Sequence, residues 1–149
     1  LHTNDAPSSI TRLQNMGTPN YLISAALTLI MAQRLARRNC SECREQDENV
    51  TPKLLNSIGF LPEQSARAKI YKGKGCDQCS NTGYKGRMGV YEILEIDREL
   101  KQGILSDLSQ AELNGIAKKN GFRTMQEMGH DLLLSGDLSF SEFERVLQS

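Results

Sequence analysis

Four cysteines carry the clearest chemical signal in this sequence. They form two pairs, Cys40-x-x-Cys43 and Cys76-x-x-Cys79. A spacing of two residues lets both thiolates of a tight turn face one metal ion, and two such turns supply the four sulfurs of a tetrahedral zinc site with Zn–S bonds of about 2.3 Å. Four thiolates leave no open position on the ion for water or substrate, so the predicted zinc is structural.

Disulfides and redox chemistry are the alternatives to zinc. Disulfides are typical of oxidising compartments and small secreted proteins, whereas adjacent C-x-x-C pairs in a cytosolic protein are more often metal ligands. A redox C-x-x-C needs one pair at the start of a helix with a lowered pKa, and this chain has two matched pairs. The spacing therefore favours zinc.

Composition narrows the class of protein. The chain has 149 residues, in which 18 Lys and Arg balance 18 Asp and Glu. This neutral balance argues against a dedicated nucleic-acid binder, which needs a dense cationic surface. The longest apolar run, Tyr21–Ala32, is far shorter than the ~20 residues of a membrane-spanning helix. One globular domain, or two small ones, is expected.

The sequence gives only weak signals for the helices and strands that position the cysteines. Residues 39–84 form short polar segments, with one helix expected at Pro52–Ile58 and a short strand at Lys69–Lys72. We expect this stretch to have too few apolar residues to hold itself together, so that zinc would replace hydrophobic burial there.

Helices are predicted before the cysteine segment. Apolar residues recur at helical spacing in DAPSSITRLQNMGTP, and Asn4 or Asp5 is placed to cap this helix. The run NYLISAALTLIMAQRLARR, residues 20–38, predicts a second helix that is apolar nearly all round until Gln33.

After the cysteines the sequence predicts one strand and then helices. GRMGVYEILEI, residues 86–96, is rich in residues that favour strands and is flanked by glycine. Everything after Asp97 has a helical pattern. The capping-box spacing, in which a Ser or Thr precedes a Glu by three residues, occurs three times: Ser109 and Glu112, Thr124 and Glu127, Ser139 and Glu142.

Several of these segments together resemble one protein family. LHTNDA, TRL, MG, AQRLARR, CSEC and GKGCDQCSNTGYKGRMGVYEIL, in this order, resemble the C-terminal part of the traffic ATPases of type IV pilus assembly and type II secretion. The stretch IYKGKGCDQCSNTGYKGR resembles the sequence of the pilus extension motor more than the sequences of the secretion ATPases. The resemblance covers residues 1 to about 96, and the helical tail is compatible with it.

The resemblance implies an α/β fragment: the C-terminal piece of a RecA-like ATPase core with a four-cysteine zinc-binding insertion and a C-terminal helical bundle. It divides the chain into the end of the core with the histidine box (1–38), the zinc-binding subdomain (39–84), a strand returning to the core sheet (85–96) and a helical subdomain (97–149). By this resemblance the metal ligands are Cys40, Cys43, Cys76 and Cys79.

The resemblance also implies a nucleotide site. His2 would be a catalytic residue that contacts the terminal phosphate, and Arg34 of AQRL would lie near the nucleotide or a subunit boundary. The chain contains no G-x-x-x-x-G-K-[ST] phosphate-binding loop and begins inside the histidine box. We therefore expect a piece of a longer protein that uses ATP and Mg²⁺ only when complete, and that is inactive alone.

The family role is that of a cytoplasmic homo-hexameric motor, peripheral to the inner membrane, that acts on a membrane platform protein and binds no nucleic acid. Two alternatives remain open on the sequence. One is a free-standing zinc-ribbon module that binds protein or nucleic acid, and the other is a scaffolding domain without catalytic relation. The near absence of aromatic residues among the basic ones weighs against nucleic-acid binding.

Overall fold

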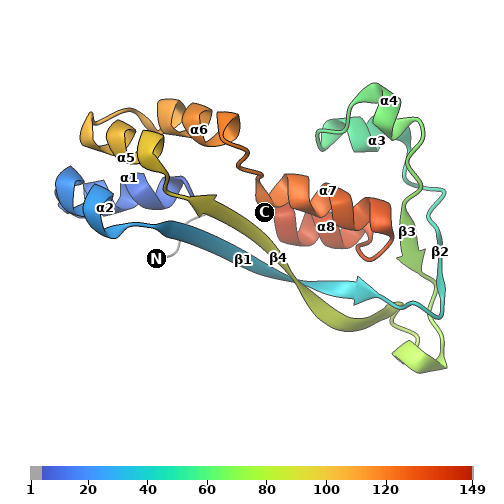
Figure 1. The fold of residues 1–149 in the computed structure, drawn as a ribbon. Helices are drawn as coiled ribbons and strands as arrows, with labels where there is room; N and C mark the ends of the chain where they lie inside the picture. The colour runs from blue at the N-terminus through green and yellow to red at the C-terminus, as the bar shows by residue number, and fades with distance from the viewer. Residues whose placement is uncertain (1–4, 149) are drawn as a thin grey trace. The chain divides into compact units, whose positions relative to one another are not determined.

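The computed structural model describes residues 5–148, which form two antiparallel strand pairs and a set of short helices (Figure 1). The elements, in chain order, are α1 (Ser8–Asn15), α2 (Asn20–Ala26), β1 (Leu29–Asn39), β2 (Arg44–Gln46), α3 (Pro52–Ser57), α4 (Pro62–Ser65), β3 (Tyr71–Gly73), a 3₁₀ turn (Asp77–Cys79), β4 (Tyr84–Glu95), α5 (Arg98–Leu105), α6 (Gln110–Lys119), α7 (Met125–Ser135) and α8 (Phe140–Leu147).

The chain divides into two compact units. One contains the residues up to Gln33 together with Tyr91–Met125, and the other contains Arg34–Val90 together with the residues from Gln126 on. The long strands β1 and β4 pair with each other, and both pass from one unit into the other. Each unit therefore combines segments that are far apart in the sequence.

The first unit has one hydrophobic core, formed where α1, α2, α5 and α6 meet the ends of β1 and β4. Its buried residues are Ala6, Ile10, Ile23, Leu94, Ile96, Leu100, Ile104, Leu113 and Ala117. The Ile96 N–H donates to the Thr28 carbonyl at 2.9 Å, which extends the antiparallel pairing of the two long strands. The side chain of Glu92, only 2% exposed, accepts hydrogen bonds from the backbone N–H groups of Ala6 and Met125.

The second unit contains the cysteine segment. Its β2 pairs antiparallel with β3, with Glu45 opposite Lys72. Leu55, Ile58, Phe60 and Ile70 of this segment are buried, as are Leu133, Leu138 and Phe143 of α7 and α8 and their connection. The ring of His130 lies 4.4 Å from that of Phe60 and 5.6 Å from that of Phe143. The segment thus has apolar contacts besides its cysteines, more than the sequence led us to expect.

The second predicted helix is wrong over most of its length. The helix α2 ends at Ala26, and residues 29–39 form the strand β1 instead. Leu, Ala, Gln and Arg all favour helices, but helix propensity is weak and yields to tertiary context. Exposure alternates along β1 from Leu29 to Leu35, which is the two-residue period of a strand paired with β4.

The other predicted elements are confirmed with shifted ends. The strand predicted at residues 86–96 is β4, and the helix predicted at Pro52–Ile58 is α3. The Asp5 carboxylate accepts a hydrogen bond from the Ser8 N–H at 2.7 Å at the start of α1, as expected for one of its two candidate caps. All four segments expected after Asp97 are helical.

The three capping boxes have different outcomes. Ser109 and Glu112 form a reciprocal capping box at the start of α6. The helix α7 begins directly after Thr124. Ser139 caps α8 by accepting from the Glu142 N–H at 3.2 Å, but the Glu142 carboxylate binds two arginines rather than returning to the cap. Local spacing therefore predicted all three helix starts and misassigned one carboxylate.

Other parts of the sequence-based fold stay predictions. These are the RecA-like core, the C-terminal helical bundle and the division of the chain into four successive segments. The helices after Asp97 are shared between the two units, α5 and α6 in one and α8 in the other. No helix formed by the described residues is both long and apolar enough to cross a membrane.

Candidate metal centre

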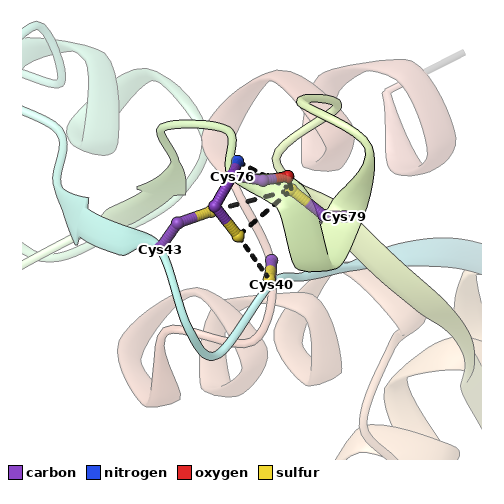
Figure 2. Close-up of side chains that lie close together, drawn as sticks. All are labelled: Cys40, Cys43, Cys76 and Cys79. Atoms are coloured by element: carbon purple, nitrogen blue, oxygen red, sulfur yellow. Dashed lines mark hydrogen bonds between the residues drawn. The ribbon is translucent and has the colours of Figure 1, made fainter.

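The four cysteines lie in two turns that the strands bring together. Cys40 directly follows β1, and Cys43 directly precedes β2. Cys76 and Cys79 lie in the turn between β3 and β4. The pairing of β2 with β3 and the hydrogen bond from the Cys40 N–H to the Gly83 carbonyl, 2.9 Å long, place the two turns side by side. Figure 2 shows the four side chains converging on one point.

The distances between the sulfurs fit one tetrahedral ion. All four Sγ atoms lie within 4.8 Å of one another. Those of Cys40 and Cys76 are 3.9 Å apart, and those of Cys79 are 3.8 Å from both Cys43 and Cys76. A tetrahedron with Zn–S bonds of about 2.3 Å has sulfurs about 3.8 Å apart. All four are free cysteines, so the disulfide alternative is not the arrangement found.

Backbone N–H groups point at the sulfurs. The Gly75 N–H donates to Cys43 Sγ at 3.3 Å, the Cys76 N–H to Cys79 Sγ at 3.2 Å and the Gly83 N–H to Cys79 Sγ at 3.3 Å. Such donors stabilise thiolates and orient metal ligands. The site therefore has the surroundings of a thiolate cluster as well as its ligand geometry.

Glycine is required beside the cysteines. Gly83 has φ +77°, and a Cβ there would lie 2.5 Å from the Gly73 carbonyl oxygen. Gly75 has φ +104°, and its Cβ would lie 2.9 Å from the Asn81 carbonyl oxygen. Any side chain would push apart the two sides of the turn that carries Cys76 and Cys79, since L residues rarely adopt this backbone and the facing atoms belong to the main chain. The glycines in GKGC and NTGY thus permit the close approach.

The thiols differ in how readily they ionise. Burial acts to raise the pKa of Cys79, but the N–H groups of Cys76 and Gly83 outweigh it and lower this pKa to about 6. Burial raises the pKa of Cys43 to about 12, and hydrogen bonds to the other cysteines act in the same direction. Four adjacent thiolates repel one another, so a cation is needed to ionise the full set.

Of the other predicted site residues, the structure describes only Arg34, which is not part of the cysteine cluster. His2 lies outside the described residues. Arg34, in β1, donates from its guanidinium to the Val146 carbonyl in the last turn of α8, where helix carbonyls lack partners and a positive charge is favourable. Its role near a nucleotide stays a prediction. The second histidine, His130, lies in α7 with Nε2 2.8 Å from the Ile58 carbonyl oxygen.

Sequence reasoning missed the polar contacts that hold the end of β1 in place. Arg37 pairs with the buried carboxylate of Glu142 at 2.7 Å, Arg38 pairs with Asp137 at 3.1 Å, and the side chain of Asn39 donates to two carbonyls. Most of these partners lie far along the chain, in or just before α8. The sequence places Arg37 and Arg38 at the end of the predicted helix over residues 20–38, and no local pattern indicates a role for Asn39.

Comparison with known proteins gives a consistent result. The family model described as "Type II/IV secretion system protein" matches residues 1–145. The chain is 39% identical over 142 residues to the type IV pilus assembly ATPase PilB of Thermus thermophilus, covering 95% of this chain and 16% of that protein. It is 38% identical over 146 residues to the protein of the same name from Pseudomonas aeruginosa, covering 98% of this chain and 25% of that protein.

A secretion protein is also similar. The type II secretion system protein E of Aeromonas hydrophila is 32% identical over 147 residues, covering 98% of this chain and 28% of that protein. The chain thus spans between about a sixth and just over a quarter of the length of these three relatives.

Proposed function

This chain belongs to the type II/IV secretion system protein family, and we propose that it forms the C-terminal region of a motor ATPase that powers type IV pilus assembly. The observation that carries the proposal is the family match over residues 1–145, which includes both cysteine pairs. A free-standing zinc-ribbon module is not favoured, because similarity to the motors extends over nearly the whole chain.

Pilus assembly is preferred to secretion as the work of this motor. Relatives named as pilus assembly ATPases are 37% to 40% identical to the chain, and those named as type II secretion proteins are 32% to 34% identical. The difference is small, and the alternative is a motor of type II secretion. Both functions use ATP hydrolysis to move protein subunits at a membrane.

The proposed metal is one structural zinc ion held by Cys40, Cys43, Cys76 and Cys79. Bound there, zinc would supply a fixed tetrahedral cross-link between the turn after β1 and the turn before β4. The four sulfurs fill the coordination sphere, so this chain's cysteines anchor the excursion between the two long strands and take no part in hydrolysis. The N–H groups of Gly75, Cys76 and Gly83 orient the thiolates.

In the complete protein we assign the nucleotide chemistry to other parts of the molecule. ATP and Mg²⁺ would bind chiefly at a phosphate-binding loop that these 149 residues do not contain, with His2 donating a hydrogen bond to the terminal phosphate and Arg34 near the nucleotide or a neighbouring subunit. The protein would act as a cytoplasmic homo-hexamer at the inner membrane, pushing on a membrane platform protein without binding nucleic acid.

The test uses the complete protein that carries this chain together with its phosphate-binding loop. We expect ATP hydrolysis, and we expect His2→Ala to lower kcat at least about tenfold with little change in KM, because a bond that strengthens during the reaction affects turnover rather than ground-state binding. Removal of the gene should abolish surface pili while secretion continues.

The matched control is His130→Gln, which changes the chain's other histidine. Its amide can still donate to the Ile58 carbonyl, so turnover per folded molecule should stay near that of the wild type even if the melting temperature falls. Absence of ATPase activity in the complete wild-type protein would refute the motor. Loss of secretion with normal pili would select the type II alternative.

A further inference from the structure

The end of β1, directly before the first metal ligand, is fastened to one turn of the second unit. This turn joins α7 to α8 and comprises residues 135–139. The backbone N–H of Asn39 donates to the Asp137 carbonyl at 2.8 Å, and the neighbouring Arg38 pairs with the Asp137 carboxylate. On the other side of the first cysteine pair, Arg44 donates to the Ser135 carbonyl at 3.3 Å. The turn therefore contacts the chain both before Cys40 and after Cys43.

Asn39 is the residue at which three segments meet. Its side-chain Nδ2 donates to the Gly136 carbonyl at 2.9 Å and to the Tyr71 carbonyl at 3.1 Å. Gly136 belongs to the turn between α7 and α8, whereas Tyr71 is the first residue of β3, the strand that leads to Cys76. Asn39 is only 4% exposed, so water does not compete freely for these hydrogen bonds.

The Nδ2 group of Asn39, rather than Oδ1, makes the hydrogen bonds of this amide. Both hydrogens of Nδ2 have carbonyl partners, whereas Oδ1 is buried without a hydrogen-bond partner among the described residues. The reverse orientation of the amide would place Oδ1 against two carbonyl oxygens, which repel it. A side chain at this position must therefore supply two hydrogen-bond donors, whereas an ionised Asp has none and Ser has one, its O–H.

The turn is built to come close to this point. Gly136 has φ +82°, and a Cβ there would lie 3.0 Å from the ring of Tyr71 and 3.1 Å from the guanidinium of Arg44. The main chain of the turn thus packs against both β2 and β3. This close approach brings the Gly136 carbonyl within reach of the Asn39 amide.

We propose that Asn39 is a positioning residue of the metal centre. By joining the strand that ends directly before Cys40 to the strand that leads to Cys76, and both to the turn at residues 135–139, its amide fixes the separation of the two cysteine pairs before the ion binds. A site whose ligands are already held apart at the right distance binds its metal more tightly, because less ordering accompanies binding. This inference rests on the proposed zinc binding.

The experiment compares zinc affinity in Asn39→Asp and in a matched control. Asn39→Asp keeps the size of the side chain and removes both donors. Asn56→Asp makes the same change at an exposed position of α3 in the same unit. Zn²⁺ affinity of the purified chain is measured by competition with a chromophoric chelator, and the absorption spectrum of the Co²⁺ form reports whether four thiolates still bind.

We expect Asn39→Asp to bind Zn²⁺ about 10 to 100 times more weakly than the wild type, the range found when the partners of metal ligands are changed. Asn56→Asp should bind like the wild type. Asn39→Ser keeps one donor, so its Zn²⁺ affinity should lie between those of Asn39→Asp and Asn56→Asp. If Asn39→Asp fails to fold, the test uses Asn39→Ser. A Zn²⁺ affinity of Asn39→Ser equal to that of the wild type would overturn the proposal, and a weaker affinity would support it.

Other results separate this role from simple stabilisation and from the proposed function. A purely structural asparagine would lower the melting temperatures of the metal-free and zinc-loaded forms alike and leave the zinc affinity of the folded chain unchanged, which would overturn the proposal. Wild-type zinc binding with an unaffected Asn39→Asp variant overturns this inference alone. A wild-type chain that binds no zinc overturns the metal centre and the inference together.

Discussion

The buried carboxylate of Glu142 offers the sharpest test of how the second unit is held together. Its side chain is fully buried in α8 and accepts hydrogen bonds from the backbone N–H of Arg37 at 2.7 Å, from the Arg37 guanidinium at 2.7 and 3.0 Å and from the Arg145 guanidinium. The Arg37 guanidinium also lies 4.2 Å from the centre of the Tyr84 ring. Glu142→Gln keeps the shape of the side chain and removes its charge.

The expected cost is about 3 kcal/mol in the free energy of unfolding. Removing one partner of a buried ion pair costs roughly 3–5 kcal/mol when the other charge is left buried. Here the arginine side chains are 48% and 54% exposed, so both regain water when the carboxylate is lost. The Gln side chain still accepts with one oxygen, but its amide nitrogen faces donors. These features place the cost at the lower end of the range.

The cost should depend on pH with a definite sign. Burial acts to raise the pKa of Glu142, but hydrogen bonds from Arg145 and Arg37 outweigh it and hold this pKa at about 2. The unfolded chain has a value of about 4.3. A lowered folded-state pKa gives stability that is complete above the unfolded value and is lost as pH falls from about 4 to about 2. Protonated Glu142 then resembles the Gln variant.

Urea denaturation followed by circular dichroism, between about pH 2 and pH 7, measures this difference. The free energy of unfolding of the wild type should exceed that of Glu142→Gln by about 3 kcal/mol at about pH 7 and by less than about 1 kcal/mol near pH 2. Both proteins have the same cysteines, so any effect of acid on the cysteines cancels in the difference between their free energies of unfolding. Glu144→Gln, the same change at an exposed position of the same helix, is the control. A difference that stays constant with pH, or an equal effect of both substitutions, would refute the reasoning.

Three further outcomes are expected. By elemental analysis, the wild-type chain should contain about one equivalent of zinc and the Cys76→Ser variant less than about a tenth of an equivalent. Amide exchange in Cys76→Ser should be faster than in the wild type in β2 and β3 but not in α6. The isolated chain should show no micromolar ATP binding in calorimetry, because it has no phosphate-binding loop. Glu92→Ala should cost about 2 kcal/mol in thermal unfolding, since it leaves the buried N–H groups of Ala6 and Met125 without acceptors, whereas exposed Glu95→Ala should cost under about 0.5 kcal/mol.

The sequence by itself determined what depends on near neighbours. The two-residue spacing within each cysteine pair is enough to predict paired ligands, and the cluster in the structure agrees with it. A cap and its partner are three residues apart, so Ser109 and Glu112 could be predicted without knowledge of the fold. Family membership also came from contiguous motifs, and the family match confirms it.

Tertiary structure decided whatever depends on distant partners. Residues 29–39 have helix-favouring side chains, yet they form β1 because β4, which lies far along the sequence, supplies hydrogen-bonding partners along its length. Glu142 fits the local pattern of a capping box, but a buried carboxylate needs opposite charge, which Arg37 and Arg145 provide. The amide of Asn39 was invisible in the sequence because its carbonyl partners are main-chain atoms, which no residue type marks and only the folded chain brings within reach.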